Sequence, residues 1–391
     1  MVYDPAEDSF LIQKEVKRLA KGRVLDMGTG SGIQALTAAK SAKVKSVLGV
    51  DIKKSSIDHA KQHSKHRKIR WLVSDLFAKV PKTNKFDTII FNPPYLPEQE
   101  GELWELKTEI AGGRKGFELI ERFMDHVNDY LEPNGQVLLL FSTITGKMKV
   151  ESIIEQHMME FEQLNKLNIA FEQLYVYKIT KGKFRKQLER RGVTKINPLA
   201  KGHRGLIYTG TYKKKRITVK IQRSDIGAKG TVDNEIKQLR KLNKKGIGPT
   251  LIFSGKDYFA YNFVQGDFIR QYFDRPKTTK KDVITVLKRT FEQMYILDQL
   301  GVNKEEMHHP VKHVIVGPNN KVTLLDFERC KPRAKVHNVT QFAQFTISSR
   351  LIPHLERHKL NISMLEMLHR AQHYSKSKTR ANFDRILELL K

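Results

Sequence analysis

Three glycines at alternate positions, Gly28, Gly30 and Gly32, follow a short apolar segment at residues 23–26 and precede a run of helix formers at 33–42. Glycine lets the backbone of such a turn approach a ligand closely, and the amides that begin the next helix are free to bind it. The spacing alone is a weak signal. It departs from the Gly-x-Gly-x-x-Gly pattern of dinucleotide-binding turns, because no glycine occupies the last position.

Aspartates end the first strand-like segments of the chain, at Asp26, Asp51 and Asp75. Their carboxylates could accept hydrogen bonds from an amino-acid ammonium, a ribose diol and an adenine amino group, respectively. This set of acceptors suits S-adenosylmethionine (SAM) better than a dinucleotide. We therefore predict an SAM site formed by these aspartates, by Leu76 beside the third of them and by the glycine turn.

A second constellation, Asn92-Pro93-Pro94-Tyr95, directly follows the apolar residues 88–91. Such a tetrad also occurs in ordinary turns, but its position after a fourth strand-like segment favours a functional site. Here the chain resembles the class I methyltransferases. The tetrad resembles the signature of those members that methylate a nitrogen conjugated to a planar group, either a glutamine amide or the exocyclic amine of adenine.

The residue types of the tetrad suit that chemistry. A conjugated nitrogen has a delocalised lone pair and is a poor nucleophile, so an enzyme must orient it and accept hydrogen bonds from its N–H groups. The Asn92 side-chain oxygen and the Pro93 carbonyl could accept the two hydrogens. The adjacent Pro94 stiffens the backbone, and Tyr95 could lie against the flat substrate group.

Strand-like and helical segments alternate through the first half of the chain. The strand-like segments are 23–26, 46–51, 69–73, 86–91 and 135–141, and 170–179 has the pattern of a final antiparallel pair. Alternation of this kind predicts an α/β fold with a doubly wound, Rossmann-like parallel sheet, which binds ligands at the carboxyl ends of its strands.

The opening segment indicates which group of class I methyltransferases the chain resembles. Residues 2–11, Val-Tyr-Asp-Pro-Ala-Glu-Asp-Ser-Phe-Leu, resemble the start of the archaeal and eukaryotic glutamine methyltransferases that modify class I translation release factors, and so do residues 111–116. The resemblance covers roughly residues 1–180. It implies that Asp8 and Ser9 lie in a segment that folds over the cofactor. It also implies N5-methylation of the glutamine in a Gly-Gly-Gln loop, and a small zinc-binding activator subunit as partner.

Two alternatives stay open. A nucleic-acid adenine-N6 methyltransferase would share the chemistry of the tetrad, and the opening segment is what argues against it. The acidic stretch at residues 96–111 could clamp a basic loop of a protein substrate or form a solvated lid.

The composition becomes basic and loses its strand pattern over residues 180–201, so we predict a methyltransferase domain at 1–181 and a different domain at 182–391. The second domain resembles a two-lobed α+β protein kinase. Residues 200–208 are similar to a kinase glycine-rich loop that keeps Gly202 and Gly205 but has alanine in place of the first glycine.

The resemblance implies roles for further residues of a nucleotide site. Lys220 would bind the nucleotide phosphates, Glu235 would pair with it, and Asp326 would hold Mg²⁺ on ATP. Counting back from the next strand-like segment puts His313 at the position of the amide metal ligand and His308 at that of the catalytic aspartate.

That region is similar to the predicted serine/threonine kinases of archaea, relatives of the RIO and lipopolysaccharide kinase groups. Glu305, Glu306 or His308 could supply a base. The alternative is a nucleotide-binding pseudokinase scaffold.

Charge and composition limit the function classes. The 391 residues carry 71 Lys+Arg against 42 Asp+Glu, a net charge of +29, of which +21 falls in residues 201–391. The densest run, residues 213–216, has the pattern of a hairpin tip. Such a field attracts RNA or ribosomes as possible partners. We find no apolar run long enough to span a membrane and only one cysteine, Cys330, and we expect a cytoplasmic protein without disulfides.

Overall fold

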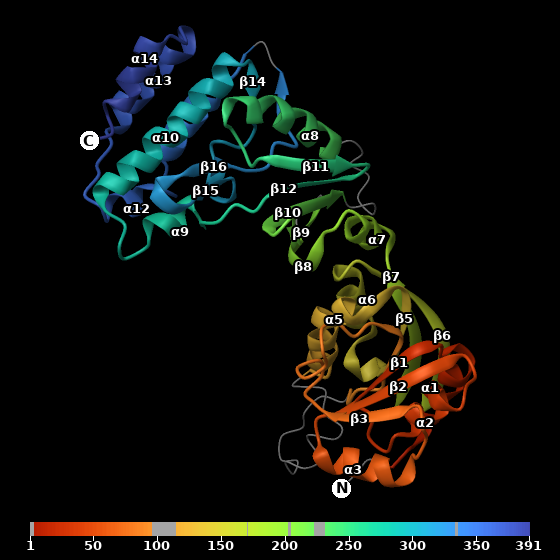
Figure 1. Ribbon diagram of the computed structural model, residues 1–391. Helices are drawn as coiled ribbons and strands as arrows, with labels where there is room; N and C mark the ends of the chain where they lie inside the picture. Colours follow the sequence, from red (N-terminus) through yellow and green to blue (C-terminus); the bar gives the residue numbers. More distant parts are fainter. Residues whose placement is uncertain (1–3, 96–114, 170, 202–204, 223–230, 333–334) are drawn as a thin grey trace. The chain divides into compact units, whose positions relative to one another are not determined.

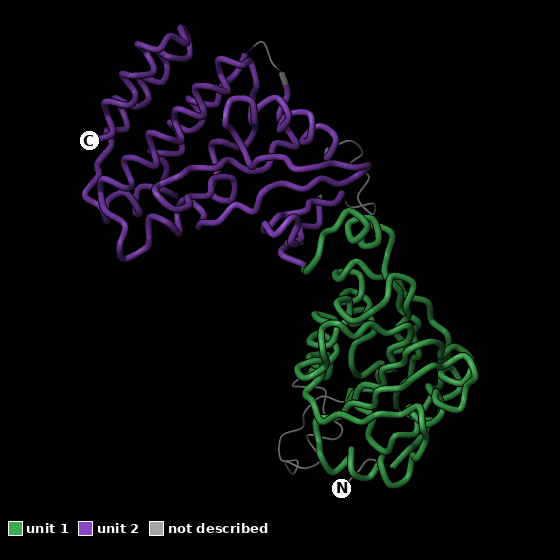
Figure 2. Tube along the Cα trace, viewed as in Figure 1, with its two compact units in different colours: residues 1–197 green, residues 198–391 purple. Residues whose placement is uncertain are grey.

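The computed structural model describes residues 4–95, 115–169, 171–201, 205–222, 231–332 and 335–391. The chain forms two compact units, residues 1–197 and 198–391 (Figure 2). No helix within the described ranges is both long and apolar enough to cross a lipid bilayer.

Unit 1 is built on a mixed sheet with the strand order β3-β2-β1-β4-β5-β7-β6 (Figure 1). The pairs from β3 to β5 are parallel, whereas β7 is antiparallel to both β5 and β6. The strands are β1 (Gly22–Met27), β2 (Val44–Asp51), β3 (Ile69–Val73), β4 (Phe86–Phe91), β5 (Leu131–Ser142), β6 (Met159–Ile169) and β7 (Glu172–Lys181). The predicted doubly wound sheet is confirmed in this unit.

Helices cover both faces of this sheet, because its strands are apolar on both sides. The helices are α1 (Glu7–Leu19), α2 (Ile33–Ala39), α3 (Lys54–His63), α5 (Glu118–Tyr130), α6 (Lys147–Gln156) and α7 (Lys183–Arg190), with a short 3₁₀ turn η1 (Thr143–Thr145). Val24 packs in the core that α1 and α2 share, whereas its neighbour Leu25 packs in the core with α5 and α6.

The strand order reverses between β1 and β4, which are direct neighbours. Their last residues, Met27 and Phe91, are register partners. The loops that follow the two strands therefore start side by side at the carboxyl edge of the sheet. This is where an open α/β sheet binds its ligand.

The final antiparallel pair was predicted within residues 170–179, but those bounds are wrong. They cover only most of β7, and its partner β6 begins at Met159. Strand β6 pairs with β7 alone and carries exposed polar residues such as Glu160 and Glu162. An edge strand of this kind lacks the apolar run that marks a strand in the sequence.

The two units divide after Asn197, whereas the sequence predicts a boundary near residue 181. The contacts of α7 account for the difference. The buried Arg185 side chain donates hydrogen bonds to the carbonyl oxygens of His157, at 3.4 Å, and Ile196, at 3.0 Å. The bond to His157 ties the basic segment after residue 181 to the end of α6, and the bond to Ile196 holds the two ends of that segment together.

Unit 2 contains an antiparallel sheet with the order β11-β12-β10-β9-β8 and a smaller sheet with the order β13-β15-β16. The larger sheet comprises β8 (Thr194–Lys201), β9 (Gly205–Tyr212), β10 (Lys215–Gln222), β11 (Leu251–Gly255) and β12 (Tyr258–Asn262). The pairing of Tyr212 with Lys215 confirms the predicted hairpin, whose turn is Lys213-Lys214.

The remaining elements of unit 2 surround one large apolar core. They are α8 (Thr231–Leu242), β13 (Asp267–Phe268), α9 (Ile269–Phe273), α10 (Lys280–Gln299), β14 (Val302–Asn303), β15 (Val314–Val316), β16 (Val322–Leu324), β17 (Lys331–Pro332), α11 (Asn338–Thr346), α12 (Ile352–Glu356), α13 (Met364–Lys376) and α14 (Arg380–Leu387). Helix α8 packs on β10, β11 and β12, and α10 packs on α11 and β16.

One buried histidine links the stability of unit 1 to pH. The His157 side chain is 4% exposed at the end of α6. Burial, together with the nearby Arg185, lowers the pKa of His157 to about 4. Asp125 lies 3.5 Å from the ring but is itself 54% exposed, so it does not offset the burial. The unfolded chain therefore binds a proton on this residue more readily than the folded chain does.

We expect His157 to lower the stability of unit 1 by up to about 3 kcal/mol as the pH falls from about 6.5 to about 4. His157→Gln should remove this contribution, whereas His126→Gln, at an exposed position on α5, should not. Trp71 and Trp104 both lie in unit 1, so urea unfolding followed by tryptophan fluorescence reports this unit. Equal pH dependence in wild type and His157→Gln would contradict the assignment.

Candidate functional site

The tetrad at residues 92–95 begins directly after β4 and is held at both ends. The Asn92 side-chain nitrogen donates a hydrogen bond of 2.8 Å to Asp8 Oδ2, on the first turn of α1. The Tyr95 carbonyl accepts a hydrogen bond of 3.0 Å from Thr145 Oγ1 in η1. Asp8 is 6% exposed and Thr145 is 2% exposed, so both anchors are buried.

The bond to Asp8 decides which way the Asn92 amide points. A carboxylate only accepts hydrogen bonds, so the NH₂ group of Asn92 must face Asp8 and its oxygen must face away. That oxygen, Oδ1, is buried and has no hydrogen-bond partner among the described residues. An unpartnered buried acceptor costs stability and calls for a structural or functional explanation.

The glycine turn after β1 leaves room for a ligand. Gly28, Gly30 and Gly32 have φ angles of 65°, 51° and 83°, all in the left-handed region that favours glycine. A Cβ added to Gly30 would meet no atom within 4 Å, whereas one added to Gly32 would lie 2.9 Å from Trp71 and from Ser64. Gly32 thus allows close packing, and Gly30 borders open space.

Asp51 reaches the same turn from the end of β2. Its Oδ2 accepts a hydrogen bond of 2.9 Å from the Gly30 amide, and its Oδ1 accepts one of 2.9 Å from the Lys53 amide. Burial raises the pKa of Asp51. The carboxylate therefore shapes the turn and remains at the edge of the space that Gly30 borders.

Asp26 lies beneath the turn at the end of β1 and is 2% exposed. Its Oδ2 accepts hydrogen bonds from Thr29 Oγ1 at 2.5 Å and from the Ala35 amide at 2.9 Å. Burial raises the pKa of Asp26 to about 7, although both hydrogen bonds oppose the rise. These two bonds join the turn to α2, and neither involves Oδ1.

The structure brings Asp8, Asp26, Asp51, the glycine turn and the tetrad together at the carboxyl edge of the sheet, but it ties other predicted residues to different partners. Asp75 forms a 2.7 Å ion pair with Arg122 of α5 at the surface. Leu76 packs on the core under α5. The Ser9 side chain is buried, and its carbonyl accepts a hydrogen bond from Gln34.

The residues present fit SAM. The open space beside Gly30 admits a ligand, and Asp51 and the Asp26 Oδ1 offer carboxyl oxygens near it as acceptors for a ribose and an ammonium group. Sequence reasoning missed the contact of Asp8 with Asn92 and the anchor Thr145. No sequence signal marks either contact, because each joins residues at least 50 positions apart. The acidic stretch and most of residues 111–116 lie outside the described residues.

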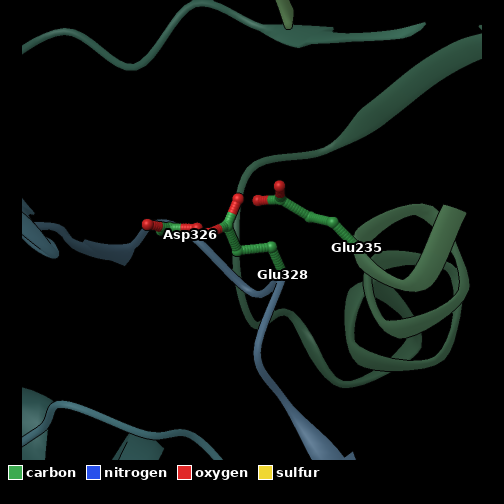
Figure 3. Close-up of side chains that lie close together, drawn as sticks. All are labelled: Glu235, Asp326 and Glu328. Carbon is green, nitrogen blue, oxygen red and sulfur yellow. The ribbon is translucent and has the colours of Figure 1, made fainter. Parts of the chain in front are cut away.

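A second cluster of charged side chains lies in unit 2 around Lys220 of β10. Its Nζ is 2.6 Å from Glu235 Oε2, 3.2 Å from Glu328 Oε2 and 3.4 Å from Asp326 Oδ1. Figure 3 shows the carboxylates of Glu235, Asp326 and Glu328 turned toward one another. Burial alone would lower the pKa of Lys220, but the three carboxylates together raise it above its ordinary value.

The geometry of this cluster suits a cation as well as Lys220. One oxygen from each of Glu235, Asp326 and Glu328 lies within 4.8 Å of the others. Carboxylate oxygens are the ligands that Mg²⁺ prefers. Asp326 has a left-handed φ of 62°, which is costly for a residue other than glycine and recurs at functional sites.

A fully buried lysine, Lys304, is bonded to the cluster through the backbone of Asp326, and sequence reasoning missed this residue. Lys304 is 1% exposed, and its Nζ donates a hydrogen bond of 2.5 Å to the Asp326 carbonyl. It also lies 3.4 Å from His313 Nδ1. Burial lowers the pKa of Lys304, and burial and Lys304 together lower the pKa of His313. Lys304 thus links His313 to Asp326, the predicted metal ligand.

Glu306 also lies beside His313, with 3.5 Å between Glu306 Oε2 and His313 Nε2. Glu306 also pairs with Arg329. His308, which counting put at the position of the catalytic aspartate, is exposed and contacts His309. Glu306, one of the three bases considered from the sequence, therefore lies next to His313.

Of the two predicted glycines of the nucleotide site, Gly205 lies within the described residues and Gly202 lies outside them. A Cβ on Gly205 would lie 3.1 Å from Lys220 Cε, so this glycine lets β9 approach the lysine side chain closely.

Comparison with known proteins concerns unit 1. Residues 4–172 match the family described as "Methyltransferase small domain". A relative from Methanocaldococcus jannaschii, named as a protein N5-glutamine methyltransferase, is 36% identical over 45% of this chain and 89% of its own length. The human methyltransferase HEMK2 is 32% identical over 37% of this chain and 72% of its own length.

Other matches cover a smaller share of the matched protein or have a lower sequence identity. The chain spans about half the length of the bacterial release factor glutamine methyltransferases that it matches. The solved E. cuniculi Mtq2–Trm112 complex, described as methylating the eRF1 termination factor, is 25% identical with a TM-score of 0.38, over 46% of this chain and 99% of that one.

The matched region contains the glycine turn, the aspartates and the tetrad, which the fold brings to one edge of the sheet. Through this first half, the chain belongs to the methyltransferase family that includes the M. jannaschii and human relatives, and unit 1 is an SAM-dependent methyltransferase.

Proposed function

We propose that unit 1 transfers the methyl group of SAM to the side-chain amide nitrogen of a glutamine in a class I translation release factor. The observation that carries this proposal is the unpartnered buried oxygen of Asn92. It is an acceptor held in place by Asp8 and aimed away from it, next to the predicted SAM site. The names of the relatives, which include protein N5-glutamine and release factor glutamine methyltransferases, support the same substrate class.

The chain contributes alignment to this reaction. SAM, when bound, supplies an electrophilic methyl carbon. The amide nitrogen is a poor nucleophile, so the reaction depends on how well it is oriented. Asn92 Oδ1 accepts one N–H of the substrate amide, the Pro93 carbonyl accepts the other, and Tyr95 covers the flat face of the amide. The anchors Asp8 and Thr145 keep the tetrad from shifting.

Two partners belong to this proposal: the release factor as substrate, and a small zinc-binding activator subunit. The resemblance of residues 2–11 to the release-factor enzymes supports both. An adenine amine would also fit two acceptors and a flat aromatic contact, so the substrate must be identified by experiment.

The test is a transfer assay with labelled SAM on purified release factor, with and without an activator subunit. We expect label on the Gly-Gly-Gln glutamine and no label when that glutamine is replaced by glutamate, because the amide nitrogen that accepts the methyl group is then missing. Adenine-containing RNA and DNA serve as the competing substrates. Label on nucleic acid alone would reject the glutamine proposal and favour an adenine enzyme.

We propose a second function for unit 2, a kinase-like nucleotide site. The observation that favours it is the buried ion pair of Lys220 with Glu235, next to Asp326. In this proposal Lys220 binds the phosphates of ATP, and Asp326 holds Mg²⁺ on them. Glu306, beside His313, is the candidate base. A pseudokinase that binds nucleotide without turnover is the alternative.

Glu328 gives this site an unusual feature. Its carboxylate lies 3.2 Å from Lys220 Nζ and is 11% exposed, so it occupies an anionic position at the lysine that a phosphate would take. A bound nucleotide would have to displace it or share Mg²⁺ with it. We therefore propose that Glu328 weakens nucleotide binding.

Neutralising the two carboxylates should have opposite effects on Mg²⁺-ATP binding. Glu328→Gln should tighten it several-fold, because a competing anion is removed, whereas Asp326→Asn should weaken it by about tenfold or more, because a metal ligand is lost. Titration with a fluorescent ATP analogue, with and without Mg²⁺, measures both. Weakening by Glu328→Gln would show instead that Glu328 is a metal ligand, and no binding in any variant would reject the nucleotide site.

A further inference from the structure

A broad basic groove lies on the outer side of α8, away from the Lys220 cluster. It has a volume of about 880 Å³ and lies between α8, its extension at residues 243–245, and the end of β11. Cations of the groove recur at Lys237, Arg240, Lys241 and Lys244, which is the spacing of one helix face. Glu235, on the same helix, points the other way into the Lys220 cluster.

The cations of this groove have no acidic partner among the residues that the structure describes. Across the described ranges, no acidic side chain forms an ion pair with Lys237, Arg240, Lys241 or Lys244. Arg240 instead donates a hydrogen bond of 2.9 Å to Ser254 Oγ, which fixes its guanidinium across the groove. The acidic residue of the lining is Asp233, at its outer end.

The lining indicates which kind of anion the groove fits. Beside its charged residues the groove has Ser254, Gly255 and one apolar side chain, Ile236, which is itself 6% exposed. A protein interface needs aromatic or large apolar anchors, which these lining residues do not provide. Contact with a nucleic-acid backbone needs only cations and small polar groups.

The spacing agrees with a phosphate backbone. From Lys237 to Lys244 the helix rises by roughly 10 Å. In a duplex, one strand presents a phosphate about every 3.4 Å along the helix axis, and an extended single strand spaces its phosphates more widely, so the stripe can meet about two consecutive phosphates. The net charge of +21 on residues 201–391 adds a long-range attraction for the same ligand.

We propose that the α8 groove, lined by Lys237, Arg240, Lys241 and Lys244, binds the sugar–phosphate backbone of RNA. Binding is independent of base sequence, because the lining offers cations for phosphates and no set of groups that reads base edges. The groove is separate from the transfer site of unit 1 and does not depend on the substrate of that unit.

The test compares two triple variants of the full chain. Lys237→Gln with Lys241→Gln and Lys244→Gln removes charge from the groove, and Lys213→Gln with Lys214→Gln and Lys215→Gln removes the same charge from the exposed end of the β9–β10 hairpin. Fluorescence anisotropy with a labelled mixed-sequence RNA of about 15 nucleotides, over about 50–200 mM salt, gives the affinity and its salt dependence. Circular dichroism melting checks that each variant is folded.

We expect the groove variant to bind at least about tenfold more weakly and to reduce the slope of log K against log salt by about 2, with a much smaller change in the hairpin variant. Equal losses in the two variants would show a general charge effect and overturn the proposal. Displacement of the RNA by an equal concentration of poly-glutamate would also overturn it, in favour of an acidic protein segment.

Discussion

The hydrogen bond from Asn92 to Asp8 is the constraint on which the site in unit 1 depends. It joins the end of β4 to the first turn of α1, and it fixes the asparagine oxygen in one direction, because the carboxylate can only accept. Helix α1 can hold Asp8 there because Leu11, Ile12 and Val16 are buried on the sheet. A buried apolar helix face thus determines the orientation of one polar atom at the edge of the sheet.

In both units, carboxylates fix the position of a nitrogen-bearing side chain. In unit 1 the buried carboxylate of Asp8 orients the amide of Asn92, and the amide oxygen has no hydrogen-bond partner among the described residues. In unit 2 the carboxylates of Glu235, Asp326 and Glu328 surround the amine of Lys220. Each site therefore depends on contacts between carboxylates and one nitrogen-bearing side chain. Where these groups are buried, losing a contact is energetically costly, because few water molecules can compensate for a missing partner.

The sequence predicts the parts of this molecule that depend on local pattern. The alternating segments predict the sheet of unit 1, and the resemblance of the second half to a kinase implies the pairing of Lys220 with Glu235 that the structure shows. The polar edge strand β6 and the buried Lys304 give no such pattern, because a lysine or a polar strand normally indicates surface. The pairing of Asn92 with Asp8 also needs coordinates, since it joins side chains 84 positions apart.

The central claim is that Asp8 acts through the orientation of Asn92. A double-mutant cycle of single-turnover methyl transfer tests it most directly, with Asn92→Ala, Asp8→Ala and both changes together, on the same substrate and at saturating SAM. The account predicts that Asn92→Ala slows transfer by about 100-fold or more and that adding Asp8→Ala costs nothing further, because the group it orients is already gone. Fully additive losses in the double variant would contradict the account.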